Sequence, residues 1–161
     1  MLGYILPKSP GLLLFLPVLL VPYCASAETP VTVPPAAERS VRANSFVAEK
    51  LWYWQRRLNL RDWNISVVVA RADILKPKTL GNIHWDTDKK TAVIRVLDPA
   101  DYEMRDAAML EDMEFTVVHE LIHLELAPVL SKFPRNEANR RDEEHAVNQM
   151  ADALLKLQRG K

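Results

Sequence analysis

The first strong hydrophobic pattern along the chain has the period of an α-helix. From about Asn44, apolar residues recur at steps of three and four positions, which places them on one side of a helix. The pattern predicts an amphipathic helix near the N-terminus of the folded part of the chain. Its apolar positions are Phe46, Val47, Leu51, Trp54 and Leu58.

The pattern then changes to that of β-strands. From Trp63 to Ala70, β-branched residues dominate and alternate positions are apolar, which predicts a strand. Two further strands are predicted at Gly81 to Trp85 and at Thr91 to Leu97. The polar run 86–90 between them is typical of a turn, so we expect these two strands to form a hairpin.

Two helices follow the strands. Asp112 is a suitable N-cap for a helix that is apolar nearly all round, so we expect this helix to be buried and to stop at Pro128. A last helix is predicted from roughly Asp142 to Leu157. The order of elements predicts a small α+β domain. It has an N-terminal helix, about three strands in an antiparallel or mixed sheet, a buried helix and a C-terminal helix.

The first 27 residues have a different composition. One charge, Lys8, precedes an apolar run from Gly11 to Val21, and Ala25-x-Ala27 fits a signal-peptidase site. We therefore expect a cleaved signal peptide over 1–27 and a secreted or periplasmic protein without a stable membrane span. A misassigned start codon ahead of a cytoplasmic protein is the alternative. The Pro-containing stretch 28–43 is predicted to be an extended linker before a domain over 44–161.

Charge and cysteine content narrow the possible partners and ligands. The chain has 21 Lys and Arg residues and 21 Asp and Glu residues, so no net charge favours nucleic acid or an anionic membrane as partner. Cys24 is the only cysteine, and cleavage after Ala27 would remove it. A transition-metal site in the mature chain must therefore use His and carboxylate ligands.

Three polar residues interrupt the predicted buried helix: His119, Glu120 and His123. Residues four apart on a helix have Cβ atoms about 6 Å apart, so the two imidazoles can bind one metal ion. Glu120 is rotated by about 100° around the helix axis and can act as a general base toward water without binding the metal. Unpaired polar groups are costly in an apolar helix, and a bound metal compensates for that cost. The spacing therefore predicts a zinc site.

A catalytic zinc needs a third protein ligand, and three candidates lie at the start of the last helix. Glu144 is favoured because the amide oxygen of Asn148, one turn later on the same face, can accept the outer N–H of a ligating histidine. Glu143 is the second candidate, although Val147 stands one turn after it and cannot accept a hydrogen bond. His145 is the third candidate and would give a site with three imidazoles, but it lies on a more exposed stripe.

These motifs resemble those of a known class of peptidases. The run His119-Glu120-Leu121-Ile122-His123, followed by a Glu on a later helix, resembles the gluzincin branch of zinc metallopeptidases. The stretch from Glu144 to Leu155 is similar to the small ImmA/IrrE-type peptidases and to phage-encoded zincins. The resemblance implies a hydrolase that cleaves polypeptides. Zinc would be bound by His119, His123 and Glu144, and Glu120 would be the general base and later the acid.

Two other functions are compatible with the same motif. One is a catalytically silent, zinc-binding interaction domain, and the other is a cytosolic processing protein of the phage type. For the peptidase, Tyr102, His84 and His145 are candidate donors to the developing oxyanion. The predicted strand Thr91 to Leu97 is the candidate that pairs with an extended peptide substrate beside the cleft.

Overall fold

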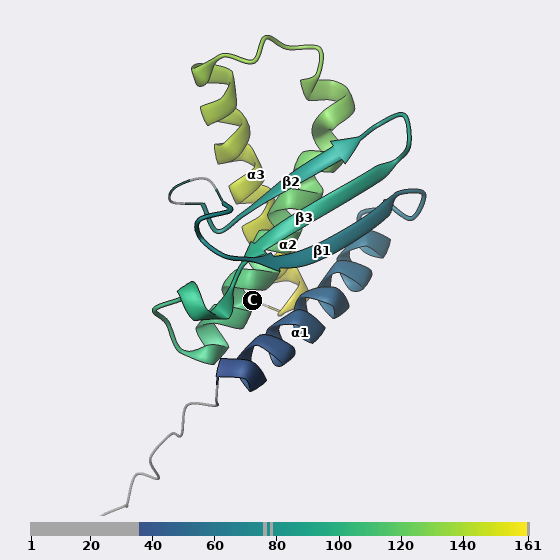
Figure 1. The fold of residues 1–161 in the computed structure, drawn as a ribbon. Coiled ribbons are helices and arrows are strands. Elements are labelled where there is room, and N and C mark those ends of the chain that lie inside the picture. The colour runs from purple at the N-terminus through teal and green to yellow at the C-terminus, as the bar shows by residue number, and fades with distance from the viewer. Residues whose placement is uncertain (1–35, 76, 78, 161) are drawn as a thin grey trace, which may run out of the picture. The chain divides into compact units, whose positions relative to one another are not determined.

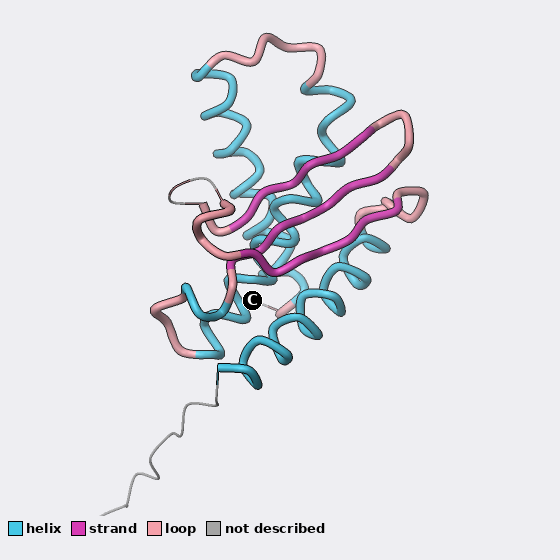
Figure 2. Tube along the Cα trace, in the orientation of Figure 1, coloured by secondary structure: helices cyan, strands magenta, loops and turns pink. Residues whose placement is uncertain are grey.

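The helices and strands follow one another in the order that the hydrophobic pattern predicts, and the α+β class is confirmed (Figures 1 and 2). The structure, a computed structural model, describes residues 36–75, 77 and 79–160. The predicted signal peptide over 1–27 lies outside the described residues. The elements are α1 (Ala36–Arg57), β1 (Asn64–Ala70), β2 (Gly81–Asp86), β3 (Thr91–Leu97), the 3-10 helix η1 (Pro99–Asp101), α2 (Asp106–Leu130) and α3 (Glu137–Gln158).

The three strands form one mixed sheet in the order β1-β3-β2. β2 and β3 are antiparallel, with Gly81 opposite Val96 and Asp86 opposite Thr91, which confirms the predicted hairpin. β1 runs parallel to β3, with Asn64 opposite Thr91. Among the described strands, β3 is therefore central, and β1 and β2 are the two edges.

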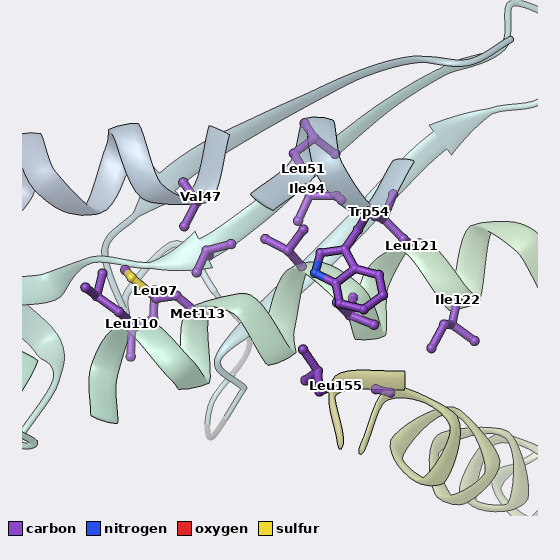
Figure 3. Close-up of a cluster of buried hydrophobic side chains, with 14 of the residues drawn as sticks. Val47, Leu51, Trp54, Ile94, Leu97, Leu110, Met113, Leu121, Ile122 and Leu155 are labelled. Carbon is purple, nitrogen blue, oxygen red and sulfur yellow. The ribbon is translucent and has the colours of Figure 1, made fainter. Parts of the chain in front are cut away.

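One face of the sheet is covered by helices. Figure 1 shows α1 beside β1 and α2 behind the strands, with α3 packed on α2. The alternate residues Ala92, Ile94 and Val96 of β3 point to this side and are buried. Figure 3 shows side chains of α1, β3, α2 and α3 that meet in one hydrophobic cluster. No helix in the described part of the chain has an apolar stretch long enough to span a bilayer.

α1 begins at Ala36, whereas the hydrophobic pattern predicted a start near Asn44. Residues 36–43 are therefore helical and do not belong to an extended linker. Ala43 is the only buried residue in this stretch, which explains why no apolar period marks it. Its tertiary anchor is Arg39, whose guanidinium donates to Asp106 Oδ1 (2.7 Å) and to the carbonyl oxygens of Pro99 (3.0 Å) and Met104 (2.9 Å).

The other two helices also begin before their predicted starts. α2 begins at Asp106, and Asp112 lies inside it, where its carboxylate accepts a hydrogen bond from Tyr102 Oη (2.9 Å) instead of capping the helix. Pro128 lies within the last turn of α2 and does not stop the helix. A proline lacks the backbone N–H, and so close to the C-terminal end its loss removes only one hydrogen bond of the helix. α3 begins at Glu137, where the side chain of Asn136 caps it by accepting the N–H of Asn139.

A buried carboxylate joins the three helices. Glu114 of α2 is only 4 % exposed. Its Oε1 accepts from Trp54 Nε1 (3.0 Å) and lies 3.3 Å from Lys50 Nζ, both on α1. Its Oε2 lies 3.3 Å from Arg159 Nη2, just after α3. Both oxygens therefore have partners, which a buried charge requires.

We predict that Glu114→Ala destabilises the protein by about 3–5 kcal/mol, because the substitution leaves Lys50 and the Trp54 N–H without their acceptor and removes one of the two carboxylates that pair with Arg159. Urea unfolding followed by tryptophan fluorescence measures the change. Glu111→Ala is the matched control on the same helix. Glu111 is exposed and also pairs with Arg159, so its loss should cost less than about 1 kcal/mol. Equal effects of the two substitutions would contradict the structural role of Glu114.

β2 passes close to α2 at Gly81. A Cβ atom at this position would collide with Thr116 Cγ2 and would lie 2.6 Å from the carbonyl oxygen of Arg95. Only glycine permits this approach, which also places β2 next to Glu120. The lack of a side chain at Gly81 therefore brings the edge strand up to the helix that carries the predicted site.

We predict that Gly81→Ala lowers the free energy of unfolding by about 1–3 kcal/mol, as overpacking does in a close-packed interior. Thr116→Ser removes the colliding methyl group and keeps the hydroxyl, so it should recover part of that loss in the double variant. Unfolding of the two single variants and the double variant measures this coupling. Unchanged stability of Gly81→Ala would show that the strand and the helix are not this close in solution.

Candidate metal centre

The predicted site residues of α2 lie in the middle of this helix, between the sheet and α3. His123 and Glu120 are buried, with 8 % and 7 % exposure, and His119 is partly buried. The two imidazole rings stand one turn apart with their centroids 4.7 Å from each other. Glu144, one of the three candidate third ligands, approaches both rings from α3.

The potential ligand atoms of His119, His123 and Glu144 form one tight group. The two Nε2 atoms are 3.0 Å apart, and Glu144 Oε2 lies 3.3 Å from His119 Nε2 and 3.6 Å from His123 Nε2. Two atoms that bind a tetrahedral zinc at 2.0–2.1 Å lie about 3.3 Å apart. Two imidazole nitrogens and one carboxylate oxygen at these spacings therefore fit a zinc ion with an open fourth position.

The outer nitrogens of the two histidines indicate their tautomers. His119 Nδ1 lies 3.1 Å from Asn148 Oδ1, and His123 Nδ1 lies 2.9 Å from Glu143 Oε1. Both oxygens are acceptors, so each Nδ1 can donate its N–H outward and leave the lone pair of Nε2 for a metal ion. At 3.0 Å, two such lone pairs repel each other unless a cation, either a proton or a metal ion, lies between them.

Glu143 and His145, the other candidate third ligands, lie differently from Glu144. The carboxylate of Glu143 points to the outer nitrogen of His123, and its Oε2 accepts from Arg135 Nη1 at 2.8 Å. His145 is exposed and does not line the cleft at this site. The supporting contact of Asn148 with His119 was expected from the helical spacing. The contact of Glu143 was missed, because the pairing of α2 with α3 decides it.

Glu120 lies beside the metal-ligand group in an environment that favours its protonated form. Burial and the nearby charge of Glu144 raise the pKa of the Glu120 carboxyl to about 8. Burial, together with the charge of His123, lowers the pKa of His119 and so favours the neutral imidazole that binds metal ions. A carboxyl whose pKa is raised toward neutral pH is suited to accept and return a proton.

The site opens into a cleft of about 410 Å³. Its walls come from β2, from one face each of α2 and α3, and from the loop 131–136 that joins these helices. Four residues of β2 line one side: Gly81, Asn82, Ile83 and Trp85. Phe115 extends an apolar surface along α2. Arg135, Arg140 and Asn148 contribute polar groups from the opposite side.

The residues that were considered as oxyanion donors do not line this cleft. Tyr102 is buried, donates its hydroxyl to Asp112 and has a pKa that burial raises. His84 belongs to β2 but alternates with Ile83 and Trp85, so it lies on the opposite, exposed face of the sheet. The expected peptide-pairing strand is also wrong. Thr91–Leu97 is the central strand β3, with both of its edges already paired, whereas β2 is the edge strand at the cleft.

Comparison with known proteins adds no relative from which a role could be transferred. No family model matches the chain, and the searches of curated proteins and of solved structures gave no match. The functional interpretation of this centre therefore depends on its own geometry and chemistry.

Proposed function

We propose that the protein is a zinc-dependent peptidase that hydrolyses peptide bonds. The observation that carries this proposal is the convergence of one oxygen and two nitrogen ligand atoms, all within 4.8 Å of one another, beside a buried carboxyl group in an open cleft. His119, His123 and Glu144 are the proposed ligands, and Glu120 is the proposed general base.

Zinc, when bound, lowers the pKa of water to about 7 and polarises a carbonyl group. The side chains of the protein supply the remaining steps. Glu120 accepts a proton from the attacking water as the oxygen of that water bonds to the scissile carbonyl carbon. The same carboxyl then donates the proton to the amide nitrogen as the C–N bond breaks. Asn148 and Glu143 keep the two imidazoles in the orientation and tautomer that metal binding needs.

The free edge of β2 supports a polypeptide as the substrate. Among the described strands β2 pairs with β3 alone, and residues of β2 line the cleft beside Glu120. An edge strand offers unpaired backbone N–H and C=O groups, to which an extended peptide can add as a further strand. Such pairing would hold a scissile bond along the cleft and over the ligand group.

We predict that the purified protein binds about one zinc ion per chain and that His119→Ala abolishes this stoichiometric binding, because the site would lose one of its three ligands. Asn148→Ala keeps all three ligands but should lower zinc affinity by about 10- to 100-fold. Elemental analysis and competition with a chromophoric chelator provide the measurement. His145→Ala, an exposed control on α3, should bind zinc as the parent does. A parent protein that binds no zinc would remove the basis of the proposal.

The role of Glu120 separates the peptidase from a catalytically silent zinc-binding domain. We predict that Glu120→Gln keeps its zinc but loses about 10²- to 10⁴-fold of its peptide cleavage, because glutamine cannot take the proton from water. Cleavage of fluorescence-quenched peptides is the measurement, with zinc content determined on the same samples. Glu125→Gln is the control, since Glu125 is exposed on the same helix. Undiminished cleavage by the Glu120→Gln variant would contradict the general-base role.

A further inference from the structure

The two ends of the metal cleft differ in chemistry. α2 and α3 pack side by side in opposite directions (Figure 1), with Asn148 beside His119 and Glu143 beside His123. Phe115 precedes His119 by one turn of α2 and gives the cleft an apolar end. Arg140 precedes Glu143 by about one turn of α3, and so lies at the opposite end.

Two of the three acidic side chains near Arg140, those of Glu143 and Glu144, already have partners. The third, Asp142, lines a hollow that adjoins the cleft and forms no ion pair with Arg140. Glu143 is held between His123 and Arg135, and Glu144 Oε2 faces the two Nε2 atoms of the ligand group. Arg140 lines the cleft and is exposed, yet no carboxylate among the described residues lies within ion-pair distance of its guanidinium. Arg140 precedes Glu144 by four positions, which is the weaker of the two orders for a helical ion pair.

We propose that Arg140 is a specificity-determining residue that binds a carboxylate group of the peptide substrate. This inference rests on the proposed peptidase function and defines its substrate class. The planar guanidinium offers two parallel N–H donors that match a carboxylate, and no intramolecular acid competes for them. The substrate is therefore a peptide with an acidic group at a fixed distance, on one side only, from the bond that is cleaved.

Two sources of the carboxylate fit this end of the cleft. A second hollow of about 280 Å³ adjoins the cleft and shares Arg135, Arg140 and Glu143 with it. Leu130, Phe133 and Pro134 give this hollow an apolar part, and Asn139 and Asp142 add polar groups. A peptide can therefore continue past Arg140, in which case an Asp or Glu side chain binds. A peptide can also end there, in which case its terminal carboxylate binds.

The first test is cleavage of a randomised peptide library by the zinc-loaded protein, with product sequences read by mass spectrometry. If a side chain binds, we expect Asp and Glu to be enriched about tenfold at one position of the cleaved peptides. If a terminal carboxylate binds, we expect peptides with a free C-terminus to be cleaved about tenfold faster than amidated ones. Arg140→Ala should abolish the preference, so that acidic and neutral peptides are cleaved at similar rates. Arg140→Glu should reverse it in favour of Lys and Arg. Arg141→Ala is the control, because Arg141 pairs with Glu137 and does not line the cleft.

The second test measures binding without cleavage. The zinc-loaded Glu120→Gln variant, with and without Arg140→Ala, is exposed to the same library, and the retained peptides are sequenced. Cleavage by the parent without acidic preference would overturn the role of Arg140 and leave the peptidase proposal standing. No cleavage by the parent, with acidic peptides retained only when Arg140 is present, would overturn the peptidase and support the carboxylate site. Neither cleavage nor acid-selective retention would overturn both.

Discussion

The burial of α2 is the constraint on which the rest of the structure depends. α1, β2, β3 and α3 all pack against this helix, so that most of its surface is removed from water. An ordinary helix in that position would carry apolar residues alone, but α2 also carries Glu114, His119, Glu120 and His123. Each polar group in such a place must be satisfied, since its desolvation otherwise costs several kcal/mol.

The neighbouring elements provide hydrogen-bond and ion-pair partners for these polar groups in two different ways. Around Glu114, donors from α1 and from Arg159, just after α3, provide partners for both carboxylate oxygens. Around His119 and His123, α3 supplies acceptors for the outer nitrogens and places the carboxylate of Glu144 beside the two inner nitrogens. The first arrangement is a closed structural contact between helices. The second is open toward the cleft, where the two inner nitrogens and Glu144 could hold a metal ion.

In the proposed holoprotein, the metal and the packing of α3 stabilise each other. Two proposed ligands come from α2 and one from α3, so the binding free energy of the ion adds to the free energy that holds the helices together. Arg135 extends this connection to the loop 131–136 through its hydrogen bond to Glu143. The shape of the cleft also depends on β2, which reaches the site because Gly81 has no side chain.

The sequence by itself determined what depends on local spacing. The periods of two and of about 3.6 residues identified the strands and helices, and the steps from His119 to His123 and from Glu144 to Asn148 placed each pair on one helix face. Tertiary structure alone decided the early start of α1 through Arg39, the central place of β3 and the contact of Glu143 with His123. Each of these depends on residues far apart in the chain or on the pairing of separate elements, and a pattern of local spacing carries no information about such distances.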